Sequence, residues 1–261
     1  MKKVEMYIQQ LQNCRDWDEY LMTNSGLPGP RGNLELAEAV RMIGSEEAFL
    51  KYISLKPEEA PENTREVFLV FCGVVGLGRL ISEGKNEYLK ILQQFASDPR
   101  WRIREAVAIA LQAYGERDMD GLINDMKYWA EGNNYEKRAA AAALCEPKLL
   151  KKKEQVMCIL QILDKITESI RGMKSKNNES FKTLKKGMAY CWSVAIVKAP
   201  DEGKRMFERW LLIDDRDINW IIKENLKKDR LKRMDEVWLQ KCNKVIDDKL
   251  SAFLTPIFSS Y

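Results

Sequence analysis

The feature that most constrains the fold is the spacing of apolar residues, which recur every three or four positions through almost the whole chain. This spacing gathers them on one face of an α-helix, because a helix turns once every 3.6 residues. No β-alternating run or Asn-Gly hairpin turn stands out. Only 14 glycines and 8 prolines occur among 261 residues, which favours long helices over turns. The sequence therefore predicts an all-α protein.

Breaks in the periodicity predict where the helices begin and end. The Gly- and Pro-rich segment 25–32 cannot sustain a helix, so we expect a loop there. Asn33, Ser45 and Thr64 are good N-caps for the helices that follow them. The expected helices cover 2–12, 16–24, 34–43, a segment after Ser45, 65–82, 87–96, 99–114, 117–130, 135–145, 150–173, 179–198, 201–212, 216–228 and 232–250.

The helices also look repeated. The second helix of a HEAT repeat carries an aspartate, then an aliphatic–arginine pair, then two alanines and a leucine. That pattern is matched here by Asp98, Ile103, Arg104, Ala110 and Leu111, with Val107 at the first alanine position, and weaker copies end at Leu144 and Leu226. The chain thus resembles HEAT-repeat proteins over about residues 33–230. The resemblance implies an α-solenoid, armadillo- or HEAT-like, wound as a right-handed superhelix.

The domain organisation that we expect is one solenoid over residues 1–261. Residues 1–32 would form N-terminal cap helices and the Gly/Pro loop, residues 33–230 the repeats, and residues 231–261 a C-terminal cap helix and tail. The loop is expected to form a structural corner, with contact to a partner as the alternative. The apolar tail from Ala252 to Tyr261 is expected to pack on the body or on a second molecule.

Charge is unevenly distributed along the chain. Residues 1–147 contain 18 Lys and Arg against 23 Asp and Glu, whereas residues 148–261 contain 25 against 16. The stretch 148–190 alone has 11 basic and 4 acidic residues. A C-terminal half with this surplus of basic residues can bind nucleic acid or another polyanion. Lysine-rich helix faces that are simply solvated have the same composition, so both interpretations stay open.

Four of the seven tryptophans lie near basic residues at helical spacing. Residues three or four apart share a helix face, so Trp101 can lie beside Arg104, and Trp220 beside Lys223. Second helices of successive repeats line one concave surface, where such residues would form a positive stripe along DNA phosphates. The candidate nucleic-acid-binding residues are Arg102, Arg104, Lys137, Arg138, Lys185, Lys186, Trp192, Trp220, Lys223 and Lys227.

Each of these candidates has a structural alternative. The arginine of a HEAT repeat commonly pairs with an aspartate of a neighbouring repeat, and Arg104 with Asp98 or Asp120 would do only that. Tryptophans are more often core residues than ligand platforms, because burying so large a ring is strongly stabilising.

The segments Trp101–Glu105, 137–138 and 215–226 are also distantly similar to the HEAT-like DNA alkylation-repair glycosylases. That resemblance implies a basic concave face around duplex DNA, with tryptophans against an alkylated nucleotide. The nearest carboxylates are Glu105, Glu146 and Asp215, but no motif matches the catalytic acid of those enzymes, so the catalytic residue is unknown. The chain has no histidine, which excludes Ser-His-Asp and Cys-His catalysis.

Other sequence features narrow the class of protein. The six cysteines are far apart without a CxxC pair, so we expect reduced core residues, no metal site and no cofactor. There is no apolar run of 18 residues and no apolar segment of signal-peptide length after the first Met, so we expect a cytoplasmic protein without membrane contact. The leading hypothesis is a protein that binds DNA through a basic concave face, with DNA repair as a candidate process. The alternatives are an alkylpurine DNA glycosylase and a non-enzymatic scaffold that binds another protein.

Overall fold

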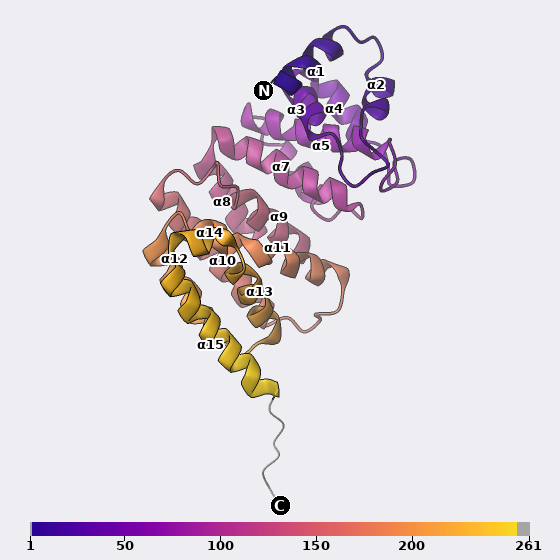
Figure 1. The fold of residues 1–261 in the computed structure, drawn as a ribbon. Helices are drawn as coiled ribbons and strands as arrows, with labels where there is room; N and C mark the ends of the chain where they lie inside the picture. The colour runs from indigo at the N-terminus through magenta and orange to yellow at the C-terminus, as the bar shows by residue number, and fades with distance from the viewer. Residues whose placement is uncertain (1, 255–261) are drawn as a thin grey trace, which may run out of the picture. The chain divides into compact units, whose positions relative to one another are not determined.

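A computed structural model describes residues 2–254 of the chain, and side chains as far as residue 249. Every helix or strand element in this range is an α-helix, which confirms the all-α prediction (Figure 1). The helices are α1 (Lys2–Gln12), α2 (Trp17–Thr23), α3 (Leu34–Ile43), α4 (Glu46–Ile53), α5 (Val67–Ser82), α6 (Tyr88–Phe95), α7 (Trp101–Arg117), α8 (Met119–Trp129), α9 (Asn134–Leu144), α10 (Lys153–Arg171), α11 (Glu179–Ile196), α12 (Pro200–Leu211), α13 (Arg216–Leu226), α14 (Asp229–Met234) and α15 (Glu236–Leu254). The side chains of the predicted apolar tail lie outside the described residues.

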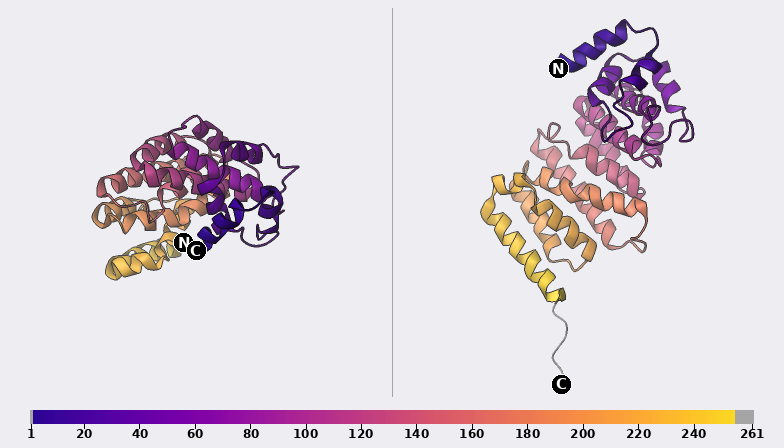
Figure 2. Two further views of the ribbon diagram at one scale, coloured as in Figure 1. Left: turned by 90° about the horizontal axis from the view of Figure 1, so that it is seen from above. Right: turned by 45° about the vertical axis from the view of Figure 1, so that its right-hand side comes forward.

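The chain divides into two compact units, residues 1–122 and residues 123–261, with the boundary inside α8. In unit 1, α1 packs on α3, α3 on α5 and α5 on α7. In unit 2, α9 packs on α11, α11 on α13 and α13 on α15 (Figure 2). In both units a helix packs on the second helix after it in the chain, which is consistent with a helical repeat. One continuous solenoid and its right-handed sense stay predictions.

Unit 1 is built around α5, which is buried on all sides and packs against α3, α4 and α7. Glycine at position 78 allows the closest approach, since a Cβ there would lie 2.4 Å from the carbonyl oxygen of Ala110 on α7. Gly76 likewise receives the ring of Phe49 from α4. The small residues in an otherwise bulky sequence therefore set the helix spacing in this unit.

A buried ion pair fixes the connection between α4 and α5 in unit 1. Arg100 donates to both carboxylate oxygens of Asp98 at 2.8 Å, and both side chains are buried. The same guanidinium donates to the carbonyl oxygen of Ala60 at 3.1 Å. Because a buried charge needs both a partner and hydrogen bonds, this arrangement ties the start of α7 to the 54–66 segment.

Unit 2 contains a buried polar contact between α13 and α11. Asn225 has no exposed surface, and its amide donates to the carbonyl oxygens of Met188 and Ile221, both at 2.9 Å. Its own oxygen accepts the main-chain N–H of Ser193 at 2.9 Å. Asn225 thus satisfies the hydrogen-bonding groups of its amide by joining α11 and α13.

Two of the predicted N-caps are confirmed, whereas one predicted N-cap and one predicted uninterrupted helix are wrong. Asn33 and Ser45 accept main-chain N–H groups as N-caps. Thr64 does not cap α5, which begins at Val67, because its hydroxyl donates to the carbonyl oxygen of Pro61 instead. The single helix expected over 232–250 is broken at Asp235, whose extended backbone ends α14 and whose carboxylate accepts the N–H of Trp238 in α15.

Candidate functional site

Trp192, a predicted DNA contact, has no exposed surface. Its indole N–H donates to the hydroxyl of Thr167 at 3.0 Å, and its ring meets Phe207 edge-on with centroids 5.8 Å apart. A ring enclosed in this way cannot stack on a base. The structure therefore corrects this prediction, because Trp192 is a core residue that joins α10, α11 and α12.

Arg102 and Arg104 are also buried, contrary to their predicted role at phosphates. Arg102 donates to the carbonyl oxygen of Gly29 at 2.6 Å and lies 3.1 Å from the Glu62 carboxylate. Arg104 donates to the carbonyl oxygens of Asp98 and Pro99, at 2.7 Å and 3.0 Å. The structural alternative for Arg104 was an ion pair with an aspartate such as Asp98. Arg104 does bind Asp98, but through the main-chain carbonyl oxygen, whereas Arg100 forms the ion pair with the Asp98 carboxylate.

Lys137 and Arg138 lie in the first turns of α9 and are half-buried. Burial lowers the pKa of Lys137, because a low-dielectric environment disfavours the charged amine. The aliphatic part of Arg138 lies over Gly187 of α11, where a Cβ would come within 2.9 Å of the arginine Cγ. Both side chains thus contribute packing surface as well as charge.

Lys185, Trp220 and Lys223 are brought together by the structure. With Arg216 and Asn219 they line a hollow of about 420 Å³ between α11 and α13, which we call the Trp220 hollow. The indole of Trp220 is 37% exposed, and the ammonium of Lys185 lies 4.7 Å from its ring centroid. This geometry is a cation–π contact between two helices that sequence spacing did not reveal.

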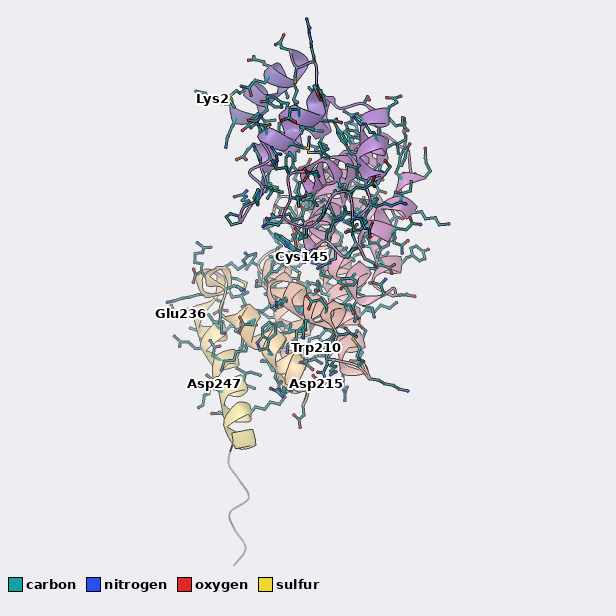
Figure 3. All side chains as sticks on the ribbon, turned by 90° about the vertical axis from the view of Figure 1, so that its right-hand side faces the viewer. Lys2, Cys145, Trp210, Asp215, Glu236 and Asp247 are labelled. Atoms are coloured by element: carbon teal, nitrogen blue, oxygen red, sulfur yellow. The ribbon has the colours of Figure 1, made fainter. Side chains whose placement is uncertain are left out.

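Acidic residues at the start of α13 hold the lysines around the hollow. Asp217 pairs with Lys185 at 2.7 Å. Asp215 accepts the N–H groups of residues 217 and 218 as the N-cap and pairs with Lys176 at 2.8 Å. Burial alone would raise the pKa of Asp215, but the Lys176 hydrogen bond and the two N–H donors together lower it. Figure 3 labels Asp215 at the beginning of α13.

The remaining predicted lysines differ in their pairing. Lys223 pairs with Asp247 of α15 at 3.0 Å, and Lys227 pairs with Glu224 one turn earlier. Lys186 and Arg216 are exposed and take part in no ion pair within residues 2–249. The surface around the hollow therefore has mixed charge, and of the three cations that line it, Arg216 has no acidic partner within residues 2–249.

The three carboxylates considered for catalysis have different positions. Glu105 lies in unit 1, on the wall of a separate cavity described below. Glu146 accepts the N–H of Lys148 at 3.3 Å in the turn after α9. Asp215 is engaged as an N-cap and ion-pair partner. None of these three carboxylates lines the Trp220 hollow.

The cysteines and the acidic groups form no metal site in the part of the chain that the structure describes. All six cysteines are free, and four of them are buried. Burial raises the pKa of the Cys72 and Cys145 thiols, so both are held in the neutral form. Among the described helices, none is long and apolar enough to cross a membrane.

Comparison with known proteins gives no further assignment: no family model, no curated protein and no solved structure matches this chain. The similarity to HEAT-repeat proteins and to the HEAT-like glycosylases therefore rests on the sequence pattern alone.

Proposed function

We propose that the protein is a helical-repeat DNA-binding protein whose contact surface is the Trp220 hollow of unit 2. The observation that carries the proposal is an exposed indole framed by three cationic side chains, Lys185, Arg216 and Lys223, in one hollow. Cationic side chains bind backbone phosphates, and an exposed aromatic ring stacks on a base. Stacking requires an open base, so branched or single-stranded DNA fits better than an intact duplex.

The charge of unit 2 supports this proposal. Residues 123–261 contain 28 Lys and Arg against 20 Asp and Glu, whereas residues 1–122 contain 15 against 19. A surplus of this sign raises the local concentration of an anionic ligand and speeds its association. The long-range field and the local hollow therefore favour the same class of partner.

The ion pairs of the hollow do not prevent phosphate binding. Lys223 and Asp247 are both largely exposed, and exposed pairs of this kind contribute roughly 0–1 kcal/mol. Replacement of Asp247 by a phosphate at Lys223 is therefore a small rearrangement of one side chain. Arg216 needs no such rearrangement, because no ion pair engages it among the described residues.

Fluorescence anisotropy with labelled single-stranded, branched and duplex DNA tests the proposal. Three phosphate contacts predict that affinity for duplex falls about 40-fold between 50 and 200 mM salt. Trp220→Ala should weaken binding of single-stranded DNA about tenfold, since stacking contributes roughly 1–3 kcal/mol per base. Arg216→Gln should weaken all DNA forms and reduce the salt dependence.

Two matched controls make this experiment specific. Tyr128→Ala removes another exposed aromatic ring of unit 2, 76% exposed and outside the hollow. Lys241→Gln removes one exposed cation of α15 that does not line the hollow. If the controls weaken binding as much as Trp220→Ala and Arg216→Gln, binding is diffuse and the hollow is not the site.

A protein partner is the second candidate, and the mixed charge around the hollow favours it. Lys185 and Lys223 each stand beside an aspartate, and Trp220 offers an aromatic anchor of the kind that interfaces use. Absence of binding to every DNA form at low salt would leave this candidate and remove the first. We propose no catalytic step, because Glu146 and Asp215 are engaged in local structure.

A further inference from the structure

Unit 1 contains a cavity of about 160 Å³ beneath the Gly/Pro loop of residues 25–32, and the proposed DNA contact does not use it. Its walls are mainly apolar. Leu27 and Leu34 line it together with Phe68 and Phe71 of α5. Trp101 of α7 lies at the rim and is 46% exposed. Sites for organic ligands are concave and apolar with a few polar groups, as this one is.

The volume of the cavity limits what it can hold. An apolar cavity of about 150 Å³ accommodates one benzene molecule. A cavity of 160 Å³ therefore matches one phenyl ring or one branched aliphatic side chain. Since apolar cavities of this size do not retain water well, an apolar guest gains free energy by entering.

The loop over the cavity is held in place before any ligand binds. Gly29 accepts a hydrogen bond from Arg102 at 2.6 Å through its carbonyl oxygen and donates its N–H to Asn63 at 3.2 Å. Ser25 accepts the N–H of Asn33 at 2.8 Å, which closes the base of the loop. A preformed wall lowers the ordering cost of binding.

Charged groups of opposite sign line the same cavity. Arg31 is exposed, and it forms no ion pair among the described residues. Arg102 is committed to Gly29 and Glu62, so Arg31 is the cation that remains for a ligand. The half-buried carboxylate of Glu105 lies on the α7 wall. A guanidinium beside an apolar cavity is complementary to a carboxylate attached to an apolar group.

We propose that this cavity binds the side chain of an aromatic or large aliphatic amino acid whose α-carboxylate pairs with Arg31. The ring or branched chain fills the space between the loop, α5 and α7. The carboxylate comes from a free amino acid or from the C-terminal residue of a peptide. In the free amino acid, Glu105 attracts the ammonium group.

Isothermal titration with five probes distinguishes these sources. The probes are L-phenylalanine, 3-phenylpropionate, phenethylamine, and a tetrapeptide ending in phenylalanine with a free or an amidated C-terminus. Binding of phenylalanine but not of the peptide identifies a free amino acid, and the reverse identifies a chain end. Phenethylamine and the amidated peptide should bind at least about tenfold more weakly, because they lack the charge-assisted bond to Arg31.

Variants connect the binding to this cavity. Arg31→Gln should weaken the carboxylate probes about tenfold, while Arg65→Gln, another exposed arginine of unit 1, should have no effect. Leu34→Trp should fill the cavity and abolish binding, with Leu50→Trp on α4 as the control for fold and helix content. Binding of phenethylamine as tight as that of phenylalanine would overturn the proposal, and so would no binding of any probe at millimolar concentration.

Discussion

The two exposed tryptophans beside cations show how differently the units use the same combination of residues. In unit 1, Arg102 lies 4.5 Å from the ring of Trp101, but its guanidinium is buried and holds Gly29 and Glu62. In unit 2, Lys185 lies 4.7 Å from the ring of Trp220 and pairs with Asp217, and both charged groups are half-buried. A cation next to tryptophan is a buried structural brace in the first unit and a half-buried group that lines an open hollow in the second.

The reason for the difference is the chemistry of the two cations and their surroundings. A guanidinium has five donors in a fixed plane, so it can satisfy several acceptors when buried. An ammonium is a compact, strongly hydrated charge and remains near water. Unit 1 has carbonyl oxygens of its long connections for Arg100 and Arg102 to bind, whereas Lys185 meets only one carboxylate.

The largest expected effect comes from the buried arginine of unit 1. Arg100→Ala leaves the buried carboxylate of Asp98 without its partner, so the free energy of unfolding should fall by about 3–5 kcal/mol. Chemical denaturation followed by circular dichroism measures it. Arg216→Ala in unit 2 is the control and should leave the midpoint unchanged. A loss below about 1 kcal/mol for Arg100→Ala would contradict the role of arginine as a brace.

The second largest effect is expected in unit 2, where the buried Asn225 joins α11 and α13. Asn225→Ala removes the acceptor of the Ser193 N–H and the donor to Met188, so unfolding should become easier by about 2–3 kcal/mol. Hydrogen exchange at the amide of Ser193 provides the local measurement, because its protection should fall. An unchanged exchange rate at Ser193 would show that α11 is stable without the hydrogen bonds of Asn225.

A direct comparison of the two cation–tryptophan contacts gives a smaller difference. Arg102→Met should destabilise unit 1 by about 2 kcal/mol, because the part-buried carbonyl oxygen of Gly29 loses a hydrogen bond from a charged donor. Lys185→Met should cost about 1 kcal/mol, because it removes a half-buried ion pair with Asp217 but leaves no main-chain acceptor without its donor. Thermal unfolding of both variants is the measurement. Equal losses would mean that the units do not differ in this respect.

The smallest effect concerns acid stability in unit 2. The pKa of Asp215 is lowered in the folded protein, so its charge stabilises the fold above the ordinary carboxyl pKa. That contribution disappears as the pH falls through the folded pKa, below about pH 4. Asp215→Asn should therefore flatten the loss of stability in this range, measured by urea unfolding at several pH values. Lys176→Met should flatten it in part, because two N–H donors remain.

Helix positions were predictable from the sequence, but the exposure of individual side chains was not. Periodicity located the helices within a few residues, and Asn33 and Ser45 acted as caps because capping depends on three or four consecutive residues. The Asp235 break was missed, although an aspartate followed by glutamate is a recognisable helix start. Trp192 and Trp220 look alike in sequence, yet one is buried and the other is not.

The site was predictable only in part, for the same reason. The sequence correctly grouped Trp220 with Lys223, which are three residues apart on one helix. It placed Lys185 on the same expected stripe, but it could not predict that the Lys185 ammonium lies against the Trp220 ring, because the two residues come from different helices and are 35 positions apart. It also paired Trp101 with Arg104, whereas the guanidinium over that ring belongs to Arg102.

By itself, the sequence determined the all-helical architecture, the absence of histidine chemistry and the basic character of the C-terminal half. These follow from local spacing and composition, which need no knowledge of distant contacts. Tertiary structure alone decided that Arg102, Arg104 and Trp192 are internal, and that loop 25–32 covers a cavity. The physical reason is that burial depends on which helices pack together, and side chains far apart in sequence supply those contacts.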